Sequence, residues 1–254
     1  MGGSRDFLNS TLTMKNMRDW DDTDGFNKNL EVATRVFEMV LCARFFVLKH
    51  LLEQLPAGTD AMTARRRWVL IQVMPPYFEN RDIFSSILAK LRQAGTGVLV
   101  KLTKSIYNDL PAIAGGDIFP PGEQFFVVVD EAQQAVEYLK HSFPSTTGSE
   151  KRPVLHPFYA FLLNTGYFQG AILAGTGLSM SMVKEAVGSQ TAKLIEHPKV
   201  FVDVGRFKKG DTDHENYIRK YLPALSENVV DRITYWFTGR WATVVTIARH
   251  KTNA

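Results

Sequence analysis

The chain has 254 residues, of which 45% are hydrophobic, and a formal net charge of +4 at pH 7. This length fits one large α/β domain or a core with a small appendage, and the apolar content is enough to fill that core. The positive charge is spread along the sequence, so it weakly favours a polyanionic partner such as a nucleotide or nucleic acid. It excludes the dense basic stripe of a dedicated nucleic-acid-binding protein.

A single cysteine, Cys42, excludes an intramolecular disulfide and fits folding in a reducing compartment. We expect Cys42 to fill the core rather than to act as a nucleophile. The longest apolar segment, residues 36–55, is interrupted by charged side chains, so no membrane-spanning helix and no membrane partner are expected. The first residues lack the basic-then-apolar order of a signal peptide. These features predict a soluble intracellular protein, either cytoplasmic or nuclear.

The N-terminal part of the chain is predicted to be mainly helical. Residues 1–28 are polar and rich in Asp, Asn and Gly, which is typical of a leader on the surface. Residues 29–55 carry apolar side chains at spacings of three and four, and they predict a long, buried helix. Residues 81–94 predict an amphipathic helix. For residues 68–73 the pattern leaves a buried strand and a helix end equally open.

Two segments with glycine or proline are predicted to be loops. Residues 95–101 contain Gly95, Gly97 and Lys101, but the spacing is wrong for a loop that binds phosphate. Residues 107–122 are rich in Pro and Gly, and they predict a loop that leads into the next strand.

The second half of the chain alternates strands with helices. Apolar runs bounded by turn signals predict three strands, at residues 124–129, 170–175 and 200–204. Helices are predicted at residues 132–140, 154–165, 213–221 and 227–237. This alternation predicts an α/β fold with a three-layer parallel sheet, in which the strand at 124–129 is covered on both faces.

We therefore expect three parts along the chain. Residues 1–28 are the polar leader, residues 29–207 are an α/β core, and residues 208–254 are a small helical segment that acts as a lid.

The acidic pair Asp130 and Glu131 follows the apolar strand at 124–129 directly. Ligands of open α/β sheets bind at the carboxyl ends of the strands, and an acidic pair at that place is typical of a Walker B motif. We expect Asp130 to hold Mg²⁺, mostly through water, against phosphates. We expect Glu131 to polarise a water for attack on the γ-phosphate. The competing interpretation is an acidic pair that merely caps the next helix.

Three further kinds of residue are candidates for contacts with the γ-phosphate. Thr176 follows the strand at 170–175 and is the first choice for a polar sensor, with Ser179 as the second choice and a Gly-rich turn without ligand as the alternative. Arg240 follows the last predicted helix and is a candidate for a lid arginine. It could equally be a solvated arginine after a C-cap glycine. Arg152 and Arg206 are alternative charge-stabilising arginines.

A complete P-loop has the pattern Gly-x-x-x-x-Gly-Lys-Ser/Thr between a strand and a helix, so that backbone N–H groups and the lysine surround the phosphates. No Gly-Lys-Ser/Thr occurs in this sequence. The sequence therefore contains the acidic pair that is expected to act in hydrolysis, but not the motif that binds the phosphates.

Together these segments resemble, in their order, the NTPase module of Crinkler-type proteins, which are found in oomycetes and fungi. The resemblance spans about residues 30 to 245 and is most specific in Asp-Glu-Ala-Gln and Ala-Gly-Thr-Gly-Leu-Ser. The matching segments are residues 68–75, 127–133, 152–153, 174–179 and 238–240.

This resemblance implies a P-loop ATPase with Mg²⁺ and ATP as its cofactors, acting inside a cell or its nucleus. It also implies a short N-terminal trafficking segment before the module and an effector domain after it. Neither that trafficking segment nor the Walker A segment is expected in this chain, nor an effector domain after Arg240. We therefore expect a truncated, fragmentary or degenerate version of the module with impaired catalysis.

Three hypotheses of function remain open from the sequence. The first is an ATP- or NTP-binding, ATPase-like module that uses Asp130 and Glu131. The second is a non-catalytic scaffold, derived from such an NTPase, that binds protein or nucleic acid. The third is a nuclease that binds metal through the same two acids, although no Glu-x-Lys pairing lies near them.

Overall fold

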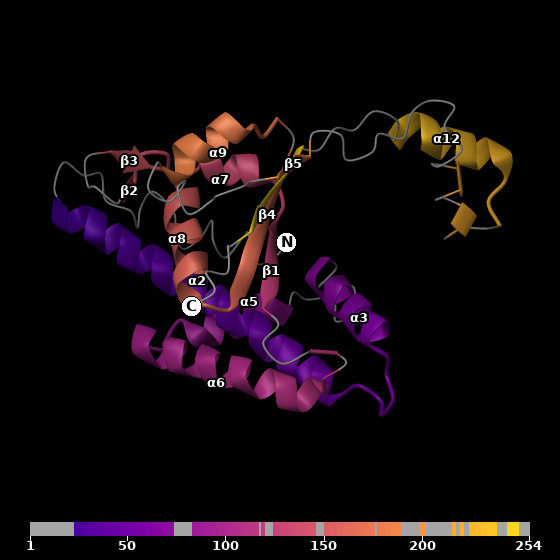
Figure 1. Cartoon of the computed structure of the whole chain (residues 1–254), viewed down its shortest axis with the longest axis horizontal. Coiled ribbons are helices and arrows are strands. Elements are labelled where there is room, and N and C mark those ends of the chain that lie inside the picture. The colour runs from indigo at the N-terminus through magenta and orange to yellow at the C-terminus, as the bar shows by residue number, and fades with distance from the viewer. Residues whose placement is uncertain are drawn as a thin grey trace.

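The computed structural model describes residues 23–73, 83–116, 118–119, 124–145, 150–175, 177–188, 199–201, 215–216, 219–220, 224–237 and 243–248. These residues form a fold of mixed helices and strands, in which helices pack beside a small sheet (Figure 1). The expectation of an α/β chain is confirmed at this level.

The longest helix, α2 (Thr23–Glu53), lies at the centre of the packing. It contacts α5 (Ile83–Leu91), α6 (Thr96–Ala114) and α8 (Leu155–Thr165). The long buried helix, the amphipathic helix and the helix at 154–165 are all confirmed. Even α2 carries too many charges for a membrane span, and no other helix of the described part is long and apolar enough to cross a membrane.

The start of α2 corrects the boundary of the leader, because the helix already begins at Thr23. Its polar first turns hide the helix from a search for apolar periodicity. A tertiary contact holds this end, since the side-chain amide of Asn29 donates to the backbone oxygen of Ser142 at 2.8 Å. Residues 1–22 lie outside the described residues.

Helix α6 corrects the loop predicted at 95–101 from Thr96 onward, and the loop predicted at 107–122 as far as Ala114. Gly95 occupies its N-cap, a position that tolerates glycine, and Pro111 lies in its last turn. The four buried residues of α6 recur at helical spacing and pack against neighbouring helices: Leu99, Thr103, Ile106 and Leu110. This packing outweighs the local preference of Gly and Pro for turns.

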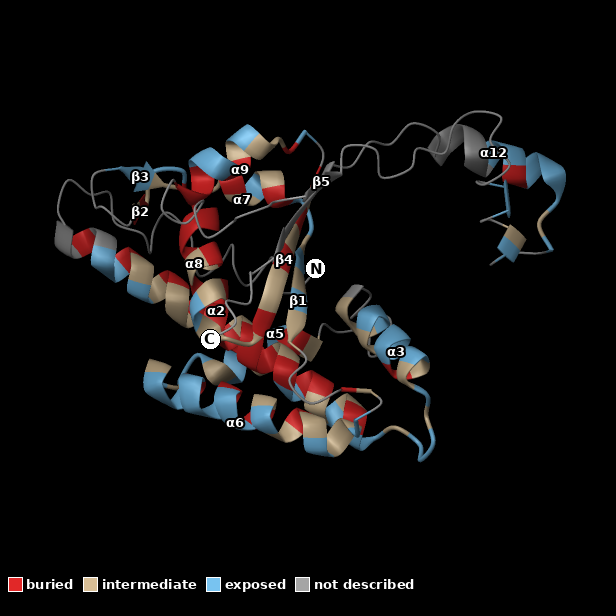
Figure 2. Cartoon of the chain, in the orientation of Figure 1, coloured by how far each residue is buried: buried red, intermediate tan, exposed pale blue. Residues whose placement is uncertain are grey.

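Helix α3 (Ala61–Val73) settles the open assignment of residues 68–73, which are helical. Asp60 caps its N-terminus by accepting from the backbone N–H of Thr63 at 3.0 Å and from the Thr63 hydroxyl at 2.7 Å. Half of the α3 residues whose burial is described are exposed (Figure 2). Ala64 is buried, and Trp68 and Ile71 pack against the core. The cap and these apolar contacts together hold the helix.

Four strands form the main sheet in the order β1–β4–β6–β5. Their bounds are Phe125–Val129 for β1, Phe168–Gly175 for β4, Thr243–Ala248 for β6 and Lys199–Phe201 for β5. Strands β1 and β4 are parallel, whereas β6 is antiparallel to both of its neighbours. The sheet is thus mixed rather than parallel throughout, because a segment for which no strand was predicted pairs between β4 and β5.

Strand β1 has one covered face and one open face. Phe125, Val127 and Val129 pack against the core, but 49% of Phe126 and 51% of Val128 are exposed. The expectation of a strand covered on both faces is therefore wrong. The uniformly apolar sequence of β1 hides this alternation, which follows from the two-residue period of a strand.

The remaining described elements all come after β1 in the chain. They are α7 (Ala132–Glu137), β2 (Phe143–Pro144), β3 (Lys151–Arg152), α9 (Met180–Val187) and α12 (Glu227–Phe237). Strands β2 and β3 form a separate antiparallel pair. The helix predicted at 132–140 is confirmed but ends at Glu137, and the helix predicted at 227–237 is confirmed with the same bounds. Figure 1 shows α12 standing away from the sheet. Of the helix predicted at 213–221, only residues 215–216 and 219–220 are described, and they are helical.

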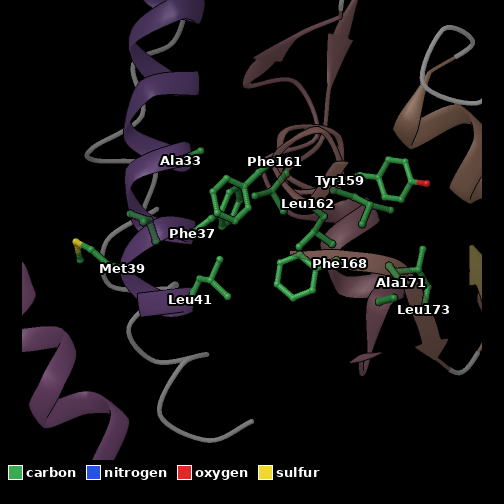
Figure 3. Close-up of a cluster of buried hydrophobic side chains, with 14 of the residues drawn as sticks. Ala33, Phe37, Met39, Leu41, Tyr159, Phe161, Leu162, Phe168, Ala171 and Leu173 are labelled. Carbon is green, nitrogen blue, oxygen red and sulfur yellow. The ribbon is translucent and has the colours of Figure 1, made fainter. Parts of the chain in front are cut away.

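The hydrophobic core joins α2, α8 and β4 (Figure 3). The ring of Phe37 on α2 lies 5.1 Å from that of Phe158 and 5.8 Å from that of Phe161 on α8. Phe168 and Leu173 bring β4 into the same cluster. The sheet is therefore fixed to the helical layer through the strand that lies next to β1.

Candidate active site

The carboxyl ends of β1 and β4 lie side by side. The two strands are parallel and Val129 pairs with Leu173, so Asp130 and Glu131 leave β1 next to the end of β4 at Gly175. The two strand ends therefore lie at one edge of the sheet. This is the edge at which open α/β sheets place their ligands.

Asp130 and Glu131 form a turn between β1 and α7, and both are exposed. The carboxylate of Asp130 accepts a hydrogen bond from the backbone N–H of Glu131 at 3.0 Å. The backbone of Glu131 is left-handed, with φ 54° and ψ 39°. Such a backbone costs a non-glycine residue about 1–2 kcal/mol. Strain of this kind gathers at functional sites more than elsewhere.

The structure bears on the alternative that the acidic pair merely caps α7. Glu131 does occupy the N-cap position, but its side chain makes no capping hydrogen bond. One carboxylate oxygen of Glu131 instead accepts a hydrogen bond from the side-chain amide of Gln133. The Glu131 carboxylate is therefore directed by a side chain rather than by the helix terminus.

The Asp130 and Glu131 carboxylates supply oxygen donors, the kind of ligand that Mg²⁺ prefers. No group of three or more His, Cys, Asp or Glu side chains that could hold a metal is found in the part of the chain that the structure describes. Mg²⁺ is commonly held by one or two carboxylates, with waters and substrate phosphates as the other ligands. Two exposed carboxylates at a strand end fit that pattern, although they do not form a complete cage.

The polar sensor candidates have different outcomes. Thr176 lies outside the described residues, whereas Gly175 before it and Gly177 after it are described. Ser179 is the N-cap of α9, where its hydroxyl accepts from the backbone N–H of Met182 at 3.2 Å. The Ser179 hydroxyl is also 2.8 Å from that of Ser181. Ser179 therefore has a structural role of its own.

Of the arginine candidates, only Arg152 is described, since Arg206 and Arg240 lie outside the described residues. Arg152 forms an ion pair with Glu150 and donates to the backbone oxygen of Glu185 near the end of α9. Its guanidinium is thus tied between β3 and α9 in this structure, and its Nε is buried without a hydrogen-bond partner among the described residues.

His156, in the first turn of α8, was not predicted from the sequence. It is buried, and its Nδ1 lies 2.7 Å from the backbone oxygen of Val187, so the ring must donate there. Burial lowers the pKa of His156, the hydrogen bond with Val187 raises it by less, and the nearby charge of Arg152 lowers it. The ring therefore links α8 to the end of α9.

Gln133 and Gly175 belong to the two most specific segments of the sequence, but neither was expected to have a role of its own. Their contact joins α7 to the end of β4. The sequence signal was the glycine at a strand end, but its partner is set by tertiary packing.

Comparisons with models of protein families, with curated proteins and with solved structures found no match to this chain. The two strand ends, the acidic pair and the sequence around them are therefore the features that bear on function.

Proposed function

We propose that the chain is a nucleotide-binding, P-loop ATPase-like module whose three-layer core carries a Walker B-type acidic pair. The observation that carries this proposal is the parallel pairing of β1 and β4, which sets Asp130 and Glu131 beside the end of a second strand. The left-handed backbone and the directed carboxylate of Glu131 support it further.

In this proposal Asp130 would contribute a carboxylate ligand to Mg²⁺, which would bind together with ATP and neutralise phosphate charge. Glu131 accepts a proton from a water as the water oxygen bonds to the γ-phosphorus. The bond between the γ-phosphorus and the bridging oxygen breaks, and its electron pair leaves with ADP. Thr176 would contact the γ-phosphate or the water, and Arg240 would stabilise the charge that develops.

The sequence sets the expected strength of this activity. Because it contains no Gly-Lys-Ser/Thr, the cradle of N–H groups and the lysine that normally hold the β- and γ-phosphates are missing. We therefore expect weak binding of Mg²⁺-ATP and slow or absent hydrolysis by this chain alone.

Calorimetric titration with Mg²⁺-ATP, combined with a thermal-shift assay, tests the proposal. The wild-type chain should release or absorb heat on binding, Asp130→Ala should weaken binding, and Glu131→Gln should bind but lose any turnover about 10²–10⁴-fold. Glu137→Gln is the matched control, because Glu137 is an exposed acid on the same helix, away from the strand ends. Absence of both heat and thermal shift in the wild-type chain would reject a nucleotide-binding function.

The second candidate is a non-catalytic scaffold that binds a protein partner, and the open apolar face of β1 favours it. Phe126 and Val128 leave about half of their surface exposed on a strand that contains no charged residue. On this proposal Mg²⁺-ATP gives no heat. A protein partner should bind Asp130→Ala as tightly as the wild type, whereas Phe126→Ser should weaken its binding.

A further inference from the structure

Gln133, in the first turn of α7, contacts residues at the ends of both β1 and β4. Its amide nitrogen donates to the carboxylate of Glu131, two residues earlier. Its amide oxygen lies against the backbone of Gly175, at the end of β4. One side chain thus connects the acidic residue after β1 with the end of the neighbouring strand.

Gly175 is required at this position because there is no space for a side chain. A Cβ atom at this position would overlap the amide oxygen of Gln133, and it would lie 3.1 Å from the amide carbon and 3.3 Å from the backbone nitrogen of Ala132. The backbone of Gly175 is not left-handed, so the glycine is not needed for its conformation. The amide of Gln133 fills the space that any other residue at 175 would need for its side chain.

The orientation of the amide is set by Glu131. If the amide were turned over, its oxygen would face a carboxylate oxygen, and two acceptors would repel each other. In the observed orientation the nitrogen is bonded, and the oxygen is buried without a hydrogen-bond partner among the described residues. A buried amide oxygen without a donor is unfavourable. The bond to Glu131 is therefore kept, although the amide oxygen of Gln133 is left without a hydrogen bond from the described residues.

We propose that Gln133 is a positioning residue for Glu131, which it holds at the junction of β1 and β4. This inference rests on the proposed function for the role of Glu131, but its geometry is testable without turnover. A merely structural glutamine would be expected to satisfy its own oxygen. Gln133 instead leaves its oxygen without a partner among the described residues, while its nitrogen is bonded to the Glu131 carboxylate beside the two strand ends.

Gln133→Met is the informative substitution, because methionine has a similar length and no groups for hydrogen bonding. If Gln133 positions Glu131, Met should lower kcat for Mg²⁺-ATP about tenfold or more with little change in KM. The melting temperature should stay equal or rise, since an unsatisfied oxygen has been removed. Gln134→Met is the matched control, because the next residue is an exposed glutamine on the same helix. A fall in melting temperature with kcat unchanged would overturn the proposal.

A second measurement works even if the chain does not hydrolyse ATP. In a nitrogen-15 NMR spectrum, the side-chain amide of Gln133 is identified by its disappearance in Gln133→Met. Its resonance should shift in Glu131→Gln, which replaces the charged acceptor, and should not shift in Glu137→Gln. An amide that is unmoved by Glu131→Gln would show that the two side chains do not interact, and would overturn the inference.

Gly175→Ala tests the other contact of the same amide. It should displace Gln133, move its NMR signal and lower the melting temperature. The loss should be smaller in a Gln133→Ala background, because the shorter side chain leaves room for the new Cβ. Equal losses in the two backgrounds would contradict the contact. If the NMR and stability results are as expected but Mg²⁺-ATP does not bind, the proposed function fails while the positioning of Glu131 stands.

Discussion

Glu38 is a carboxyl group buried between α2 and α6. It is 4% exposed, and its Oε1 has no hydrogen-bond partner among the described residues. Burial raises the pKa of Glu38 above its ordinary value of 4.5, and a hydrogen bond with Thr103 lowers it by less. The nearby Cys42 thiol has a raised pKa for the same main reason, burial, which fits the expectation that it fills the core.

The raised pKa of Glu38 predicts how stability depends on pH. The folded state holds the proton more tightly than the unfolded state, so the contribution to stability is complete below pH 4.5 and is lost as the pH rises through the folded pKa. Glu38→Gln removes this dependence because its amide does not titrate. In urea unfolding from pH 4 to pH 8, the free energy of unfolding of the mutant should rise relative to that of the wild type as the pH increases. Parallel curves would contradict the prediction.

At the scale of elements, the all-apolar sequence of β1 does not indicate which face of the strand packs against the core. Its sequence predicts a strand correctly, but it gives no sign of which residues face the core. Val127 packs against the core and Val128 is 51% exposed, although the two are chemically identical neighbours. The difference comes from the packing of helices against one face of the sheet.

The two valines form a matched pair for a test of this difference. Val127→Thr places a hydroxyl against the core and should cost about 1–2 kcal/mol of the free energy of unfolding. Val128→Thr keeps the shape and the β propensity on an open face, and it should stay within about 0.5 kcal/mol of the wild type. Chemical denaturation measures both values. Equal losses would mean that both faces of β1 are covered.

The same contrast shows how far the sequence determines the fold and the site. Helices α2, α5 and α8 were predictable because their apolar residues recur with a helical period. Helix α6 was not, because Gly97 and Pro111 hide a buried face that only packing reveals. The position of Asp130 and Glu131 at a strand end follows from local sequence. The contact between Gln133 and Gly175 requires two segments to meet in space, and no local pattern encodes it.

At the scale of the whole molecule, α2 connects parts that are distant in the sequence. It packs against α5 and α6, which follow it, and against α8, which comes after β1. The candidate site lies on β1 and β4, and β4 is fixed to α2 and α8 through the core of Figure 3. Because one helix makes these contacts, a substitution that destabilises α2 should also destabilise the sheet that carries the candidate site.

Phe37 and Phe46 on α2 give a test of this connection. Phe37 is 5% exposed and its ring meets two rings of α8, whereas Phe46 is 51% exposed. Phe37→Ala should cost about 3–5 kcal/mol, a large part of the roughly 5–15 kcal/mol that holds a domain folded. Phe46→Ala should cost far less. Far-ultraviolet circular dichroism and the near-ultraviolet signal of the packed aromatic rings should report the loss in Phe37→Ala at one shared midpoint. Two separate midpoints would show that α2 does not unite the helices and the sheet in one cooperative unit.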